Sequence, residues 1–183
     1  MLNDYNSLKG ALVDTAKLKL VKMLLLDVDG VLTDGSIVYN ESGEEIKAFN
    51  VKDGLGIRML LGSGINVGIV TGRSSKAVYH RCHDLGISLI FDGVRDKAAA
   101  LDAILKQTRL LPQETAFVGD DLLDLPALKK VGLSIAVADA HEIVRKNVDM
   151  VTSAKGGKGA VREICESILK AQGFWESILM RYV

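Results

Sequence analysis

Residues 21–34 constrain the fold more than any other part of the chain. They begin with an almost uninterrupted apolar run and end in Asp27 and Asp29, which flank a single valine. Apolar residues at successive positions predict a strand that is buried on both faces, as in the centre of a parallel sheet. Because side chains alternate along a strand, both carboxylates are expected on one side of the backbone, where they repel unless a cation or a shared proton compensates.

Magnesium is the cation that such a pair fits best, because hard divalent ions prefer oxygen ligands. A turn in which aspartate caps the backbone and Gly30 adopts a positive φ explains the same residues without a metal, and the pair alone leaves both interpretations open. An EF-hand loop fits poorly, since Leu32 stands where that loop needs glycine and Val38 where it needs glutamate.

Strand-like and helix-like segments alternate along the rest of the chain. This alternation predicts an α/β fold of three layers, Rossmann-like, with a parallel sheet between two helical layers. In the helix at residues 53–61, Leu55, Met59 and Leu60 are expected to face inward. The expected strands span residues 66–70, 87–91, 115–118, 134–137 and 148–151, and the expected helices span residues 7–18, 53–61, 76–85, 96–110, 123–131, 140–146 and 161–171.

Polar residues follow three of the expected strands. They are the pair Asp27 and Asp29, then Thr71, then the pair Asp120 and Asp121. Sites in open parallel sheets lie beyond the carboxyl ends of the strands, so these side chains are expected to meet at one edge. The chain has no Gly-x-Gly-x-x-Gly after a strand and no Walker A sequence, which leaves dinucleotide enzymes and P-loop NTPases unsupported.

Residues 36–50 read as a β-hairpin, with two β-prone runs around the turn at residues 40–43. Ile37, Val38 and Tyr39 cannot all face one side of the ribbon. A two-stranded ribbon with apolar residues on both faces is unstable alone in water, which predicts that the hairpin packs against other subunits.

Composition sets the broad class of the protein. The 183 residues suit one domain, residues 1–183, and 23 basic against 23 acidic residues give no net charge that would favour nucleic acid or a membrane surface. The chain shows no signal-peptide pattern and no membrane-spanning run, so a cytoplasmic location is expected. Cys82 and Cys165 have no Cys-x-x-Cys spacing and are expected to be reduced, structural thiols.

Four segments together resemble the motifs of the haloacid dehalogenase superfamily in both order and spacing. They are Asp27-Val28-Asp29-Gly30-Val31, Thr71-Gly72-Arg73, Lys97 and Gly119-Asp120-Asp121, and the resemblance spans residues 20–170. Carboxylates, a hydroxyl, a lysine and Mg2+ are also the groups that phosphoryl transfer needs.

The resemblance implies a role for each matching residue. Asp27 would be the nucleophile that forms an aspartyl-phosphate, and Asp29 would be the general acid and base. Thr71 would bind the phosphoryl group, which Lys97 would orient and neutralise. The implied Mg2+ ligands are Asp27, the backbone carbonyl of Asp29 and Asp120, with Asp121 and Asp124 in support.

The spacing between the motifs leaves room for no cap domain, because only the hairpin and one helix fit between Asp29 and Thr71. An open site must exclude water by other means. Similar capless members form homotetramers in which the hairpins associate and neighbouring subunits cover each site.

Four longer segments, Asp27 to Gly35, Gly43 to Gly54, Gly119 to Leu122 and Gly156 to Glu163, resemble the family of 3-deoxy-D-manno-octulosonate 8-phosphate phosphatases, and the similarity covers nearly the whole chain. This implies a phosphorylated sugar acid as the substrate, whose extra carboxylate an aspartate-lined edge would repel without added arginine and lysine. It also implies that the glycine-rich segment at residues 155–159 reaches a neighbour's site. The implied substrate contacts are Asp29, Asn50, Val51, Lys52, Asp53, Gly54, Arg58, Arg73, Arg81 and Lys97.

Two alternatives stay open on the sequence. The same chemistry could act on another sugar-acid phosphate, such as a nonulosonate 9-phosphate. The chain could also be a non-catalytic relative kept as an oligomerisation module, although such a protein has no chemical need for Asp27, Asp29, Lys97 and Asp120. Residues 155–159 could be a solvated linker, and residues 174–183 are more apolar than expected, as in a subunit contact.

Overall fold

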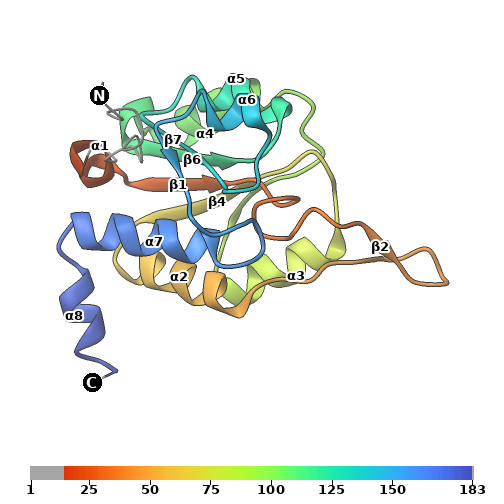
Figure 1. Ribbon diagram of the computed structural model, residues 1–183, viewed down its shortest axis with the longest axis horizontal. Helices are drawn as coiled ribbons and strands as arrows, with labels where there is room; N and C mark the ends of the chain where they lie inside the picture. The colour runs from red at the N-terminus through yellow and green to blue at the C-terminus, as the bar shows by residue number, and fades with distance from the viewer. Residues whose placement is uncertain (1–14, 183) are drawn as a thin grey trace, which may run out of the picture.

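A parallel sheet of six strands forms the centre of the computed structural model, which describes residues 15–182 (Figure 1). The strand order is β5-β4-β1-β6-β7-β8, and every pairing is parallel. The predicted α/β fold is therefore confirmed. The strands are β1 (Met23–Leu26), β4 (Asn66–Val70), β5 (Leu89–Phe91), β6 (Thr115–Gly119), β7 (Leu133–Ala136) and β8 (Met150–Val151).

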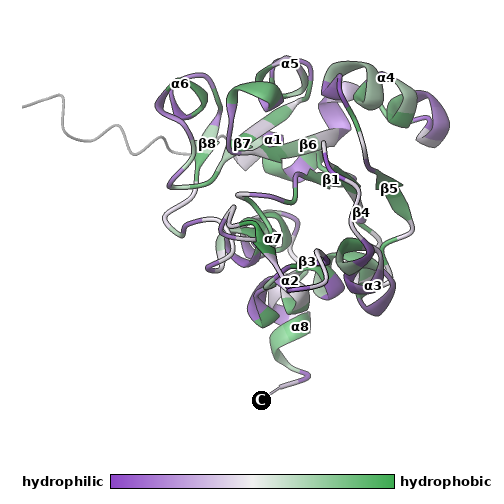
Figure 2. Ribbon diagram, turned by 90° about the vertical axis from the view of Figure 1, so that its right-hand side faces the viewer, coloured by the Kyte–Doolittle hydropathy of each residue, from purple (hydrophilic) through white to green (hydrophobic). Residues whose placement is uncertain are grey.

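Helices cover both faces of this sheet, as the three-layer prediction requires. In Figures 1 and 2, α4, α5 and α6 lie on one face, and α2, α3 and α7 lie on the other. The expected helix at residues 7–18 falls mostly outside the described residues. The helices are α1 (Thr15–Leu20), α2 (Val51–Gly62), α3 (Lys76–Leu85), α4 (Lys97–Thr108), α5 (Leu125–Leu128), α6 (Glu142–Arg145), α7 (Ala160–Ala171) and α8 (Trp175–Leu179), with 3-10 turns η1 (Pro112–Glu114) and η2 (Leu122–Asp124).

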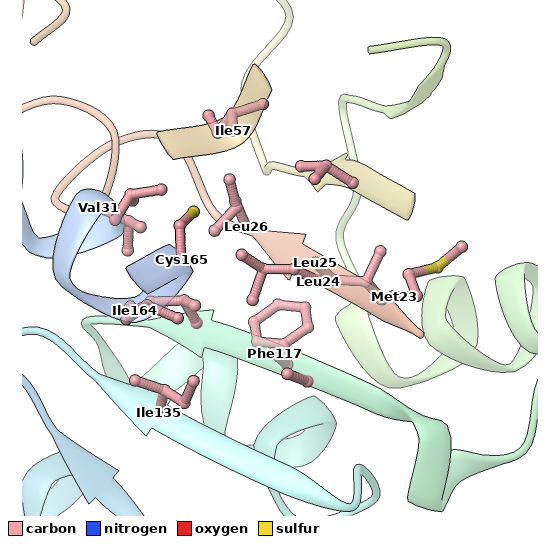
Figure 3. Packing of buried hydrophobic residues seen from close by; sticks show 14 of the residues in the cluster. Met23, Leu24, Leu25, Leu26, Val31, Ile57, Phe117, Ile135, Ile164 and Cys165 are labelled. Atoms are coloured by element: carbon pink, nitrogen blue, oxygen red, sulfur yellow. The ribbon is translucent and has the colours of Figure 1, made fainter. Parts of the chain in front are cut away.

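The core is built around β1, whose four residues are all buried. Leu24, Leu25 and Leu26 have no exposed surface, and Figure 3 shows them packed beside Phe117 of β6. Burying a leucine fully contributes about 2 kcal/mol, so this strand is anchored firmly in the sheet. The carboxylates that follow it are thereby held on a rigid support.

Helix α2 approaches α7 most closely at Gly56. A Cβ atom on Gly56 would lie 3.1 Å from Cys165 Cβ, so the absence of a side chain there lets α7 approach closely. The inward face therefore runs through Gly56, Ile57 and Leu60, and Leu55 is 39% exposed. The expectation that Leu55 points into the core is wrong, because the close contact of the two helices selects a different face.

The predicted hairpin is present as strands β2 (Val38–Tyr39) and β3 (Glu45–Ile46), which pair antiparallel. It projects away from the body of the protein in Figure 1. Between β1 and β4 the chain forms only this hairpin and α2, so no cap domain is inserted there. The hairpin exposes Ile37, Val38, Tyr39 and Ile46, each by about half.

Two further expectations concern features away from the site. Both Cys82 and Cys165 are buried free thiols, as predicted. None of the helices in residues 15–182 has the length and apolar character needed to cross a membrane.

Candidate active site

The polar residues that follow the strands do meet at one edge of the sheet. They line a hollow of about 270 Å³ beyond the carboxyl ends of β1, β4 and β6, which confirms the predicted position. The lining residues are Asp27, Asp29, Gly35, Thr71, Gly72, Arg73, Val94, Arg95, Lys97, Asp120, Asp121, Leu123 and Asp124.

Asp27 stands directly after β1 and is 7% exposed. Its Oδ1 accepts a hydrogen bond of 2.7 Å from the backbone N–H of Val28, and its Oδ2 lies 2.7 Å from Lys97 Nζ. Burial raises the pKa of Asp27 to about 6; Lys97 acts in the opposite direction, and Asp124 adds to the rise. The orientation of the carboxylate is thus fixed, and the positive charge of Lys97 only partly offsets the cost of burying it.

Lys97 begins α4, where the side chain of Asp96 caps the helix by accepting from Ala98 and Ala99. The cap fixes the start of the helix, and from there the side chain of Lys97 extends to Asp27 and Asp124. Its side chain is 6% exposed, and its Nζ lies 2.5 Å from Asp124 Oδ1 in addition to the contact with Asp27. Burial lowers the pKa of Lys97, but the two carboxylates outweigh burial and raise it, so the lysine stays charged.

Asp124 organises the loop that follows β6. Its Oδ2 accepts from the backbone N–H groups of Asp120 at 2.9 Å and Asp121 at 3.2 Å, while its Oδ1 accepts from Lys97. The Asp121 carboxylate accepts from the backbone N–H of Leu122 and caps η2. These two residues are therefore held as supports, which leaves Asp120 as the carboxylate of this loop best placed to bind a cation.

The side chains fit a divalent cation. Asp27, Asp120 and Asp124 each offer an oxygen atom, and these atoms lie within 4.8 Å of one another. Burial, with the neighbouring carboxylates of Asp27 and Asp124, raises the pKa of Asp120 to about 7. Three buried or half-buried carboxylates against one lysine leave an excess of negative charge, which Mg2+ with its preference for oxygen ligands would neutralise.

Gly30 lets Asp120 approach the loop that follows β1. It has a φ of +88°, and a Cβ atom there would lie 2.0 Å from Asp120 Oδ2. We expect Gly30→Ala to displace Asp120 and to lower kcat/KM by about 10²-fold, with a weaker dependence on Mg2+. Steady-state kinetics over a range of Mg2+ concentrations measure both effects.

Gly43 in the hairpin turn offers a matched control for that variant. Its φ is +75°, but no atom lies within 4 Å of a Cβ placed on it. The variant Gly43→Ala therefore carries the same backbone strain without the steric clash. Equal losses in the two variants would contradict the role of Gly30 in placing Asp120.

Residues 155–159 support the same loop from the other side. The N–H of Gly156 donates to Asp139 Oδ1 and that of Gly157 to the carbonyl of Val31, both at 2.9 Å. A Cβ on Gly156 would lie 1.7 Å from the carbonyl oxygen of Gly30. This segment, which joins β8 to α7, thus packs closely against the loop that follows β1.

Thr71 and Asp29 complete the hollow. Thr71 follows β4, is 2% exposed and is anchored through its backbone to Phe91 and Val94. Asp29 lies in the same hollow but not in the carboxylate cluster, since its Oδ1 accepts from Lys47 Nζ of the hairpin. Its side chain therefore faces the hairpin side of the site.

Two positively charged side chains at the site were not predicted from the sequence. Arg95 lines the hollow, and Lys47 contacts Asp29 from a segment that is distant along the chain. The spacing of Lys47 two residues after Glu45 places both on one face of an extended strand, which was the available signal.

Of the implied substrate contacts, Asp29, Arg73 and Lys97 line the hollow, and the rest do not. Asp53 is 1% exposed, and its Oδ1 accepts from the N–H of Arg162 at 2.7 Å, so it holds the start of α7. Asn50 caps α2 by accepting from Lys52. In this chain both serve the packing of α2 rather than the hollow.

Four of the other implied contacts line a second hollow, of about 380 Å³, which shares no residue with the first, and Lys52 lines neither hollow. Arg58 donates to the carbonyl of Asp84 at 2.6 Å, and Arg81 donates to that of Asn50 at 3.3 Å. Arg58 of α2 and Arg81 of α3 therefore face this second hollow, whereas the aspartates of the same chain line the first. The second hollow is lined by Val51, Gly54, Leu55, Arg58, Arg81 and Leu85.

Comparisons with known proteins agree with this geometry. A family model of haloacid dehalogenase-like hydrolases matches residues 86–164. The 3-deoxy-D-manno-octulosonate 8-phosphate phosphatase KdsC of Escherichia coli K12 is 51% identical over 158 residues, which cover 86% of this chain and 84% of that one.

Solved structures are similar over most of their length. The phosphatase of the same name from Moraxella catarrhalis, in complex with a magnesium ion, a phosphate ion and KDO, has a TM-score of 0.91 and 44% identity, covering 92% of this chain and 97% of that one. The phosphatase of Yersinia pestis has a TM-score of 0.87 and 46% identity, covering 88% of each chain.

Proposed function

Because this chain belongs to the family of 3-deoxy-D-manno-octulosonate 8-phosphate phosphatases, within the haloacid dehalogenase-like hydrolases, we propose that it hydrolyses that phosphate ester to the free sugar acid and phosphate. The observation that carries the proposal is the buried pair of Asp27 and Lys97 beside Asp120. A phosphatase-like module without catalysis gains nothing from a charge cluster that is costly to bury.

The reaction proceeds by attack of Asp27 on phosphorus. A carboxylate oxygen forms the new bond to phosphorus as the bond to the sugar oxygen breaks, and Asp29 gives its proton to that oxygen. Asp29 then takes a proton from the water that hydrolyses the aspartyl-phosphate. Lys97 holds Asp27 and neutralises charge, and the Thr71 hydroxyl donates to a phosphoryl oxygen.

Magnesium is assigned to Asp27, Asp120 and the backbone carbonyl of Asp29, with Asp121 and Asp124 in support. When bound it supplies neutralising charge at the phosphoryl oxygens and at Asp27, which is worth several kcal/mol in such reactions. The carboxylate cluster and the raised pKa of Asp120 support this assignment.

The carboxylate of the sugar acid is assigned to the cations around the hollow. Arg73 lies in the hollow of its own chain and has the planar, bidentate geometry that carboxylates prefer. Arg58 and Arg81 face the second hollow, which Val51 and Gly54 also line, and we assign this hollow to the site of a neighbouring subunit.

Phosphate release from a panel of substrates tests the proposal. The panel holds 3-deoxy-D-manno-octulosonate 8-phosphate, a nonulosonate 9-phosphate and hexose phosphates, each with and without Mg2+. A Mg2+-dependent preference for the eight-carbon acid supports the proposal. Preference for the nine-carbon acid would keep the mechanism and change the substrate, and no release from any of them would favour the non-catalytic alternative.

The exposed hairpin supports a homotetramer. Val38, Tyr39 and Ile46 are each about half exposed, and a two-stranded ribbon gains stability by burying such residues. We expect the wild type to run as a tetramer in size-exclusion chromatography with light scattering, and Ile46→Asp to run as a smaller species. The activity of the variant should fall as well, because the neighbour no longer covers the site.

Leu111→Asp is the control for the hairpin variant. Leu111 is 61% exposed and lies before η1, outside the hairpin. Its variant introduces the same charge and should leave the tetramer intact. A wild-type protein that runs as a monomer would contradict the assembly.

A further inference from the structure

A closed ring of four charged side chains joins the hairpin to the loop after β1. Lys47 Nζ contacts Asp29 Oδ1 and lies 2.6 Å from Glu45 Oε1. Glu45 Oε2 lies 2.6 Å from Arg73 Nη2, and Arg73 Nε lies 3.8 Å from Asp29 Oδ2. Two acids and two bases balance, so the ring is neutral as a whole.

Lys47 is the most enclosed member of the ring. Its side chain is 1% exposed, whereas that of Arg73 is 42% exposed. Exposed ion pairs contribute little, but an ammonium group removed from water is costly unless it is paired. Lys47 is paired on both sides, with Asp29 and with Glu45, so its position is well determined.

The two oxygens of Asp29 have different surroundings. Oδ1 accepts from Lys47, while Oδ2 is buried and has no hydrogen-bond partner in the structure. Arg73 Nε, at 3.8 Å, is too distant to donate to it. A buried oxygen without a partner is costly, and it marks a position where another group is expected to bind.

We propose that Lys47 is a positioning residue for Asp29: by holding Oδ1, it presents Oδ2 to the leaving oxygen of the substrate. This rests on the proposed function, in which the Oδ2 proton passes to the sugar oxygen as its bond to phosphorus breaks and Asp27 bonds to phosphorus. Lys47 itself does not touch the substrate. Glu45 fixes Lys47 from the hairpin, which makes the hairpin part of the catalytic arrangement.

This role is tested by how kcat/KM depends on the leaving group of the substrate. A sugar alkoxide needs a proton to leave, whereas p-nitrophenolate is stable as an anion and leaves without one. The ratio kcat/KM covers only the steps up to departure of the leaving group, so later hydrolysis does not enter. We expect Lys47→Met to lower kcat/KM for the sugar-acid phosphate by about 10²-fold and to leave that for p-nitrophenyl phosphate nearly unchanged.

Two variants and a control complete the experiment. Lys47→Arg retains a charged donor and should restore part of the loss. Glu45→Gln keeps the shape of the hairpin and should show a smaller loss with the same substrate dependence, which keeps the test available should Lys47→Met fail to fold. Lys106→Met, at an exposed position of α4, should resemble the wild type with both substrates.

The outcomes separate this inference from the proposed function. Equal losses on both substrates, or no loss on either, would overturn the role of Lys47. A wild-type enzyme that hydrolyses p-nitrophenyl phosphate but not the sugar-acid phosphate would overturn the proposed substrate instead, and the Lys47 comparison would then use whichever alkyl phosphate the wild type accepts.

Discussion

Replacing Asp27 with asparagine is expected to abolish turnover, with a fall in kcat on the order of 10⁴-fold or more. The amide is a poor nucleophile and cannot form the aspartyl-phosphate on which the proposed reaction depends. Phosphate release from the sugar-acid substrate at saturating Mg2+ measures the loss. Asp27 is the carboxylate that directly follows β1, and the backbone N–H of Val28 and Lys97 Nζ hold its two oxygens in the hollow.

The Asp27→Asn protein should remain folded. Burial raises the pKa of Asp27 to about 6, which means that the ionised carboxylate is unfavourable in the folded protein, and an amide of the same shape avoids this cost. Thermal unfolding should therefore give a Tm no lower than that of the wild type. Asp102→Asn, which removes an exposed ion pair with Lys130, is the matched control and should retain activity. Turnover comparable to the wild type in the Asp27→Asn protein would contradict its role as the nucleophile.

The sheet and the carboxylate cluster could be predicted because their signals are local. An apolar run such as residues 23–26 identifies a buried strand without knowledge of its partners. Since parallel strands share one edge for their carboxyl ends, residues distant in sequence, such as Thr71 and Asp120, are placed together by topology alone. Order along the chain was sufficient for this part of the site.

Which face of a helix is buried could not be predicted in the same way. Helix α2 turns Gly56 rather than Leu55 toward α7, because the closest approach of two backbones outweighs the burial of one leucine. That rotation takes Arg58 to the second hollow and uses Asp53 to hold the start of α7. Resemblance to a family names such residues as substrate contacts, but it does not say in which subunit they act.

The contact of Lys47 with Asp29 also lay beyond the sequence. The hairpin could be predicted from its two β-prone runs, but which of its side chains contact the loop after β1 depends on tertiary packing. Only the structure shows that Lys47 and Glu45 meet Asp29 and Arg73.

Removal of Mg2+ by a chelator is expected to lower activity by about 10³-fold, since the metal supplies several kcal/mol of charge neutralisation in such reactions. Addition of Mg2+ in excess should restore it. Activity that survives chelation would contradict the assignment of the cluster formed by Asp27, Asp120 and Asp124.

The same carboxylates link Mg2+ binding to stability and pH. Without metal, the pKa values of Asp27 and Asp120 are raised from 3.8 to about 6 and about 7. The folded protein therefore holds protons that the unfolded chain releases, and the free energy of unfolding falls as pH rises from about 4 to about 7. Mg2+ should raise the Tm strongly at about pH 7.5, where both carboxylates are ionised, and weakly at about pH 5, where protons compete with the metal.

The variant Asp120→Asn distinguishes the contribution of Asp120 to Mg2+ binding from its contribution to the stability of the fold. Removing one of the mutually repelling carboxylates should make the metal-free variant more stable than the metal-free wild type at about pH 7.5, while the increase in Tm on adding Mg2+ is lost. Thermal unfolding with and without Mg2+ at both pH values measures the two effects together. A metal-free variant less stable than the wild type would show that Asp120 supports the fold, whereas the expected pattern would show that the protein keeps an unfavourable cluster of charges because Mg2+ binding requires it.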